Sequence, residues 1–366
     1  MVLVVIVFIL MLLLTDVVSS HFIVETLPGF DEQLPFKLET GKVANIIFID
    51  QPVGTGYSYA KTSEAYNSND TLSATLTYDF LRKWLMDHPE YLKNPLYVGG
   101  DSYSGIYIAL VTRKIYDGVE VGDEPQMNIK GHIQGNALTD RYITMNSRVK
   151  YAHHMGLISD KIYQSAKANC NGNYVDIDPN NILCLNDLQK VKKCLNNIRR
   201  NHILENWCEL SFLMSNVHSG PWCRENNYIY SKIWANDKAV QKALSHEIRG
   251  GMKRSESYVY DIQTSIDDHC HLTSKSCRAL IYSGDHDMTI PHLSTEEWID
   301  TLKLPIVDDW EPWFIEDQVA GYKVKYLQND YELTYVTIKG AGHTTPEYKP
   351  QQCLPMVDRW FSGDPL

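Results

Sequence analysis

A serine lies where a short apolar strand enters a tight turn and a helix follows. The strand begins at Pro95, the turn carries Ser102, and the expected helix stops at Gly118. A serine on a sharp strand-to-helix turn projects its hydroxyl clear of the sheet, where it can attack a carbonyl. The usual pattern is Gly-x-Ser-x-Gly, whereas here Ser104 occupies the fifth position and Gly105 follows it. Taken alone the pattern is weak, because a small residue that merely allows the turn explains it too.

Two later segments carry an acid and a base in matching positions. An apolar strand from Arg278 ends in a turn with Asp285 and Asp287, and a β-rich strand from Glu332 ends at the Gly-flanked His343. Each group lies just past the carboxyl end of an expected strand, where open α/β sheets place their sites. The order serine, aspartate, histidine is that of α/β-hydrolases.

These segments resemble those of plant serine carboxypeptidase-like proteins. The matching stretches are 45–58, 100–105, 284–287 and 340–347, and the similarity extends over nearly everything after Val43. It is closest to the branch of the family that uses glucose esters as acyl donors. True carboxypeptidases of the family usually carry Glu before the serine, where this chain has Asp101.

The resemblance implies a role for each residue of the site. Ser102 is the expected nucleophile, which holds an acyl group, and His343 is the expected base that takes its proton. The family pattern places the acid at Asp287, so Asp285 is expected to be a turn residue. The Tyr103 N–H is expected to be one donor of the oxyanion hole, which stabilises the negative charge on the reacting oxygen.

Two charged residues are candidates for substrate binding. Asp101 matches the position where family carboxypeptidases bind the terminal carboxyl group of the substrate, and its alternative is a turn residue. Arg254 resembles a family residue and is a candidate partner for an acceptor carboxylate, or else a solvated charge.

Alternating strands and helices predict an α/β-hydrolase fold with a central, mostly parallel sheet and helices on both faces. One such helix is expected to carry Leu72, Leu76, Phe80 and Trp84 on its apolar face, with Leu81 and Leu85 beside them, and to end near Pro89. Residues 21–151 and 274–366 are the expected first and second parts of the core. Residues 152–273 lack a convincing strand and predict a helical cap insertion.

Cysteines cluster in the expected cap, because seven of the eight lie between residues 170 and 277. Such clustering indicates local stapling by disulfides. The resemblance implies two bridges, Cys170–Cys184 and Cys208–Cys223. The segment around Cys270 and Cys277 has acidic and histidine neighbours and superficially resembles a metal site. It lacks the second pair of ligands at the spacing that a metal site requires. A bridge between these two cysteines or a solvated loop is favoured there, and we expect neither metal nor cofactor.

One part of the family pattern is missing. Residues 21–42 resemble the mature N-terminus, but the first strands and the Gly-Gly-Pro-Gly-Cys loop that follow in the family are absent, and Val43 comes directly. That loop carries the second donor of the oxyanion hole. We therefore expect a weak catalyst, and an expected strand at 43–49 without a neighbour.

The N-terminus predicts entry into the secretory pathway. Residues 1–20 form an expected signal peptide, because an apolar run is followed by Ser19-Ser20, and a membrane anchor is the alternative. We expect a secreted or vacuolar protein, glycosylated at Asn69, with no membrane contact after cleavage. The net charge of −11 argues against nucleic acid as a partner.

Two kinds of function remain open. The first is acyl transfer from a small-molecule acyl ester or a peptide C-terminus, as an acyltransferase or a carboxypeptidase. The second is a catalytically impaired, truncated or alternatively spliced secreted glycoprotein, which the missing loop suggests.

Overall fold

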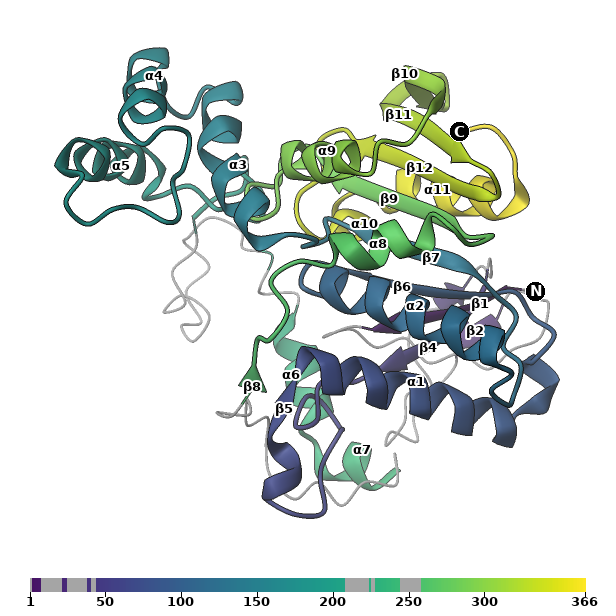
Figure 1. Ribbon diagram of the computed structural model, residues 1–366. Coiled ribbons are helices and arrows are strands. Elements are labelled where there is room, and N and C mark those ends of the chain that lie inside the picture. The colour runs from purple at the N-terminus through teal and green to yellow at the C-terminus, as the bar shows by residue number, and fades with distance from the viewer. Residues whose placement is uncertain are drawn as a thin grey trace.

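The computed structural model describes residues 2–7, 22–24, 38–40, 44–207, 224, 228–243 and 258–366. Within them, a sheet of eight strands has the order β10-β11-β12-β9-β7-β6-β1-β4 (Figure 1). Strands β4 to β12 of this order are parallel, and β11 and β10 are antiparallel, which confirms the predicted, mostly parallel sheet. The strands are β1 (Val2–Val7), β4 (Ala44–Ile49), β6 (Leu96–Asp101), β7 (Ile129–Gly135), β9 (Arg278–Gly284), β10 (Ile306–Ile315), β11 (Gln318–Gln328) and β12 (Tyr331–Ile338).

Helices cover both faces of this sheet. Because successive side chains of a strand point to opposite faces, Leu96 and Val98 of β6 join one hydrophobic core and Tyr97 joins another. The first core lies under α1 (Asp70–Asp87), α2 (Ser104–Val121), α8 (Ile266–Leu272) and α9 (His292–Thr301), and the second lies under α11 (Pro350–Ser362).

Helix α1 exists where the sequence predicted it and ends before Pro89, but its inward face is shifted from the expected one. Leu72, Leu76 and Phe80 are exposed, whereas Leu81 and Leu85, which the sequence placed beside them, are buried with Ala74 and neighbouring small polar residues. Small residues on that face let α1 pack closely against α2.

Strand β1 corrects the expectation that the strand at 43–49 lacks a neighbour. Val2–Val7 lies between β4 and β6 and pairs with both of them in parallel. Five of its six residues are valine or isoleucine, which favour strands. On its other side β4 ends the sheet, and its Ile46 and Phe48 are about half exposed (48% and 49%). Removal of residues 1–20 as a signal peptide stays a prediction.

Helices dominate the expected cap. In Figure 1, α3 (Arg141–His154) leads away from the sheet to α4 (Asp160–Asn169) and α5 (Ile182–Leu195), which project at the upper left. The later part contains α6 (Ile229–Ala235), α7 (Lys238–Ala243) and the short β8 (Tyr258–Val259), which pairs with β5 (Ser68–Asn69). The boundaries 152–273 stay a prediction, although α3 crosses the first of them.

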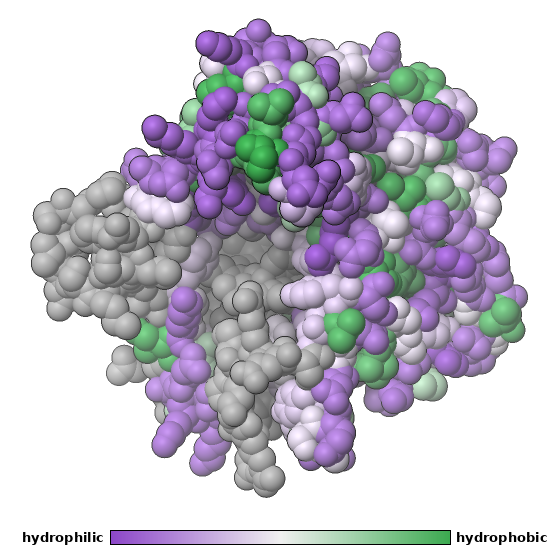
Figure 2. Space-filling view, turned by 60° about the vertical axis from the view of Figure 1, so that its left-hand side comes forward, coloured by the Kyte–Doolittle hydropathy of each residue, from purple (hydrophilic) through white to green (hydrophobic). Residues whose placement is uncertain are grey.

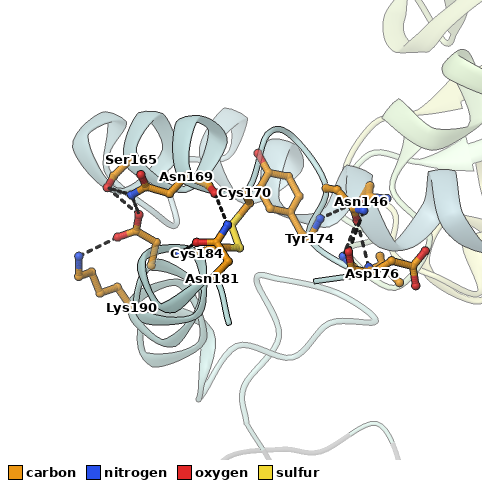
Figure 3. The surroundings of a disulfide bond; sticks show 12 residues. Asn146, Ser165, Asn169, Cys170, Tyr174, Asp176, Asn181, Cys184 and Lys190 are labelled. Atoms are coloured by element: carbon orange, nitrogen blue, oxygen red, sulfur yellow. Dashed lines mark hydrogen bonds and ion pairs between the residues drawn. A yellow bond between two sulfur atoms is a disulfide. The ribbon is translucent and has the colours of Figure 1, made fainter. Parts of the chain in front are cut away.

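A disulfide joins α4 to α5, as the resemblance implied. Cys170 follows α4 and Cys184 lies in the first turn of α5, with Cα atoms 4.8 Å apart. Figure 3 shows Asn181 beside this bond, where its side chain accepts from the Cys184 N–H and donates to the Asn169 carbonyl. The expected Cys208–Cys223 bridge lies outside the described residues. Cys270 and Cys277 are both free thiols, so the bridge favoured between them is not formed.

The remaining elements are short. They are the antiparallel pair β2 (Phe22–Val24) and β3 (Leu38–Thr40), the 3-10 turns η1 (Glu64–Tyr66) and η2 (Pro89–Tyr91), and α10 (Thr345–Tyr348). The described surface in Figure 2 is mainly hydrophilic, with scattered hydrophobic residues. Among the described helices, none combines the length and apolar character that crossing a membrane requires.

Candidate active site

Ser102 sits at the sharp turn between β6 and α2. Its φ of +56° lies in the left-handed region, a strained conformation that surrounding contacts must hold. The Ser102 N–H donates to the Gly135 carbonyl at 3.0 Å, and the Ser102 carbonyl accepts from the Leu138 N–H at 2.8 Å. A Cβ on Gly105 would lie 2.6 Å from the Leu138 carbonyl oxygen, so glycine is needed there. Packing of α2 therefore explains why the glycine stands one residue later than in the usual pattern.

His343 reaches Ser102 from the turn that follows β12. Its Nε2 lies 2.7 Å from Ser102 Oγ, and its Nδ1 lies 2.7 Å from Asp287 Oδ2. The His343 N–H donates to the Asn201 carbonyl at 2.7 Å, which fixes the backbone of this turn. Burial of the ring lowers the pKa of His343, but the charge and hydrogen bond of Asp287, together with the charge of Asp101, raise that pKa, and the net shift is upward.

The two carboxylates that follow β9 differ in their contacts. Asp287 is fully buried and accepts from His343 through Oδ2 and from the Thr289 N–H through Oδ1 at 2.7 Å. Asp285 accepts from the Gly340 N–H at 2.7 Å and has no hydrogen bond to His343. Asp285 thus joins two turns, and only Asp287 is placed to orient the imidazole.

Asn136, which the sequence reading missed, holds the acid in place. It follows β7, is fully buried, and has a left-handed φ of +40°. Its Nδ2 donates to Asp287 Oδ2 at 2.9 Å, and its Oδ1 accepts from the Gly284 N–H at 3.1 Å and the Thr345 hydroxyl at 2.5 Å. One amide therefore joins the carboxyl ends of β7 and β9 to the histidine turn. Its place after an expected strand, at the edge that carries the other groups, is a feature that any turn residue there would share, so the sequence holds no specific signal for it.

The Tyr103 N–H faces the start of α2. In the part of the chain that the structure describes, it has no hydrogen-bond acceptor. A free N–H at the N-terminus of a helix is suited to stabilising an oxyanion.

The structure describes one of the two residues expected to bind substrate, Asp101. Asp101 ends β6 and is 9% exposed, and its Oδ1 has no hydrogen-bond partner among the described residues. Burial raises the pKa of Asp101 to about 7, against a smaller opposing effect of His343. This carboxyl group is therefore about half protonated at neutral pH. Arg254 lies outside the described residues.

Other candidate sites are described in part, and glycosylation of Asn69 stays a prediction. The side chain of Asn69, the expected glycosylation site, accepts from the Leu72 N–H at 2.7 Å and caps α1. No group of three or more metal-ligating side chains gathers among the described residues. A hollow of about 390 Å³ lies behind the acid turn, beside Asp285 and His286, and does not include Ser102.

Comparisons with known proteins agree on one family. The family model described as serine carboxypeptidase matches residues 41–363. Serine carboxypeptidase-like 17 of Arabidopsis thaliana is 43% identical over 331 residues, which cover 89% of this chain and 72% of the relative. Serine carboxypeptidase-like 19 of the same plant is 40% identical over 352 residues, covering 89% and 75%. The crystal structure of Kex1(Δ)p, a prohormone-processing carboxypeptidase from Saccharomyces cerevisiae, shares the fold, with a TM-score of 0.67 and 18% identity over 87% of this chain and 74% of that one.

Replacing Asn136 should misplace Asp287 without touching any reacting atom. Asn136→Gly suits the left-handed φ but removes the amide, and Asn136→Asp keeps the shape but sets a second carboxylate against Asp287. A hydrogen bond to a charged group contributes about 1.5–3 kcal/mol, so we expect the rate at which a fluorophosphonate labels Ser102 to fall roughly 10- to 100-fold.

Asn128→Gly is the matched control, because the Asn128 amide donates to the Lys93 carbonyl in an exposed position. Labelling rates of folded Asn136 variants that equal those of the wild type and this control would show that the amide does not position the acid.

Proposed function

The chain belongs to the serine carboxypeptidase family, and we propose that it catalyses acyl transfer through a Ser102–His343–Asp287 triad. One observation carries the proposal. Ser102 Oγ and Asp287 Oδ2 each lie 2.7 Å from a different nitrogen of the His343 ring. A serine, an imidazole and a buried carboxylate in this arrangement can make the hydroxyl a nucleophile at neutral pH.

In the first half-reaction, Ser102 Oγ attacks the acyl carbonyl while His343 Nε2 accepts the hydroxyl proton. Asp287 holds the ring in the tautomer with Nδ1 protonated and stabilises the imidazolium that forms. The Tyr103 N–H donates to the oxyanion. His343 then gives the proton to the leaving group, and the acyl group stays on Ser102.

In the second half-reaction, His343 removes a proton from an acceptor that attacks the acyl-enzyme. Water as acceptor gives hydrolysis, and an alcohol gives a new ester. We propose a small-molecule ester, of the glucose-ester kind, as the donor, because Asp101 stands where carboxypeptidases of the family usually have Glu. A peptide C-terminus is the second candidate donor, because a protonated Asp101 can donate a hydrogen bond to a terminal carboxylate.

The site is proposed to act in a secreted or vacuolar protein. The Cys170–Cys184 disulfide supports this location, because such bonds persist in oxidising compartments. The missing Gly-Gly-Pro-Gly loop favours slow turnover, because loss of one oxyanion donor costs about 10²–10³ in rate. A catalytically impaired secreted glycoprotein is therefore the second candidate function.

Replacing each of the two neighbouring aspartates in turn tests the triad. Ser102→Ala should abolish labelling by a fluorophosphonate. Asp287→Asn should slow labelling by up to about 10⁴-fold, because the histidine loses its correct tautomer. Asp285→Asn is the matched control and should change the rate little, because Asp285 accepts from backbone N–H groups near the turn and has no hydrogen bond to His343. Equal, small effects of the two substitutions would contradict the assignment of the acid.

The pH dependence tests the role of Asp101. Below about pH 7 Asp101 is protonated and can donate to a substrate carboxylate, and above it the ionised group repels that carboxylate. The ratio of kcat/KM for a blocked dipeptide to kcat/KM for a glucose ester should therefore fall as the pH rises through 7. Taking the ratio removes the titration of His343, which both substrates share.

Asp101→Asn is the control, because its amide donates a hydrogen bond and stays neutral at every pH. It should leave the ratio independent of pH. A flat ratio in the wild type would mean that Asp101 does not contact the substrate carboxylate, and turnover of the ester alone would assign the chain to the ester-using branch.

A further inference from the structure

An arginine that forms no ion pair with the described residues lies beside the residue that follows the nucleophile. Arg141 is the first residue of α3, and its Cζ lies 5.5 Å from the centre of the Tyr103 ring and 4.8 Å from that of the Tyr260 ring. Its Nη2 is 3.5 Å from the Tyr103 hydroxyl. The loop that leads to α3 also contacts the nucleophile, since the Leu138 N–H donates to the Ser102 carbonyl. Arg141 therefore lies at the rim of the Ser102 turn.

The charge at this position has no carboxylate partner in the described part of the chain. No carboxylate oxygen of the described residues lies within 4.0 Å of an Arg141 nitrogen, and the buried Nε has no partner. The neighbouring Asp140 uses its side chain to accept from the Ile143 N–H at 2.7 Å. A cation at the N-terminus of a helix is also opposed by the helix dipole. The half-buried guanidinium thus packs on two aromatic rings, and its charge is not neutralised directly.

A buried network fixes the aromatic wall around this arginine. The carboxylate of Asp70 is fully buried and accepts from the Tyr103 and Tyr258 hydroxyls, each at 2.7 Å, and from the Ile262 N–H at 3.0 Å. The Asp70 carboxylate is thus directed toward the Tyr103 and Tyr258 hydroxyls and the Ile262 N–H. They also hold Tyr103 against α1, so that Arg141 lies between two fixed rings, with the outer ring, Tyr260, 55% exposed to solvent.

The position relative to the triad indicates which part of a substrate would meet Arg141. His343 approaches Ser102 from the β9 and β12 side and would protonate the leaving group there. Tyr103 turns toward α1, away from that side, because its hydroxyl bonds to Asp70. The acyl group is the part of the substrate that remains on Ser102, on the side of Tyr103.

We propose that Arg141 binds a carboxylate on the acyl group, so that half-esters of dicarboxylic acids are preferred donors. The proposal rests on the proposed acyl transfer through Ser102. Tyr103 and Tyr260 pack on the carbon chain of the acyl group, and the outer edge of the guanidinium donates two hydrogen bonds to its far carboxylate.

A matched pair of substrates tests the proposal. The p-nitrophenyl half-ester of glutaric acid carries the carboxylate, and its methyl ester has nearly the same shape without the charge. The wild type should prefer the half-ester. Arg141→Gln should lower kcat/KM for the half-ester by roughly tenfold or more and leave the methyl ester within about twofold. Arg141→Lys should retain part of the preference, because it keeps the charge but loses the fork of two donors.

Arg113→Gln is the control, because this α2 arginine pairs with Asp117 and Asp268. Phosphonylation of Ser102 by two fluorophosphonates with the same acid and methyl-ester tails supplies a readout that needs no turnover. Labelling without preference for the acid tail in the wild type, or an equal loss for both tails in the Arg141 variants, overturns the proposal while acyl transfer stands. No labelling of the folded wild type by either probe overturns the proposed function, and this inference with it.

Discussion

A fully buried carboxylate, Asp287, is the constraint on which the rest of the site depends. Burying an ionised group is costly unless hydrogen bonds and an opposite charge compensate for it. Here the compensation comes from the His343 imidazole, the Asn136 amide and the Thr289 N–H. These donors belong to the turns after β12, β7 and β9. Satisfying one charge therefore draws three strand ends together, and His343, once drawn in, has its second nitrogen at Ser102.

The parallel sheet makes this convergence possible. Adjacent parallel strands end at one edge, so groups far apart in sequence meet there: 241 residues separate Ser102 from His343. Strain is stored at the same edge, because Ser102 and Asn136 both have left-handed backbone conformations. The hydrogen bonds from the Ser102 N–H to β7 and from Leu138 to Ser102 hold the serine turn in that conformation. The site is thus preorganised by backbone contacts, and the expected cap supplies one of them, since the Asn201 carbonyl accepts from the His343 N–H.

The sequence predicted the parts that carry a local signature. Such a signature exists for the Ser102 turn, which carries a motif, and for the alternation of strands and helices. The family resemblance supplies one for the Cys170–Cys184 bridge. Asn136 has none, because an asparagine after a strand looks like any turn residue until its partners are known. The face of α1 was partly wrong, because Leu72 and Leu76 repeat at helical spacing but are exposed, while Leu81 and Leu85 make the contact with small residues beside them. The apolar run at 2–7 suits both a signal peptide and a strand, and its pairing with β4 and β6 could not be predicted because those partners are distant in sequence.

The central claim is that Asp287 and His343 form one buried, charge-stabilised pair that serves Ser102. Titration of His343 by NMR in the folded chain, with the resonance assigned by its loss in His343→Gln, measures this pair directly. We expect a pKa above the ordinary value for a histidine, because the charge and hydrogen bond of Asp287 and the charge of Asp101 together outweigh burial. In Asp287→Asn the charge of Asp287 is lost while burial remains, so the pKa of His343 should fall relative to the wild type. A pKa of His343 that is lowered in the wild type, or that does not change in Asp287→Asn, would contradict the account.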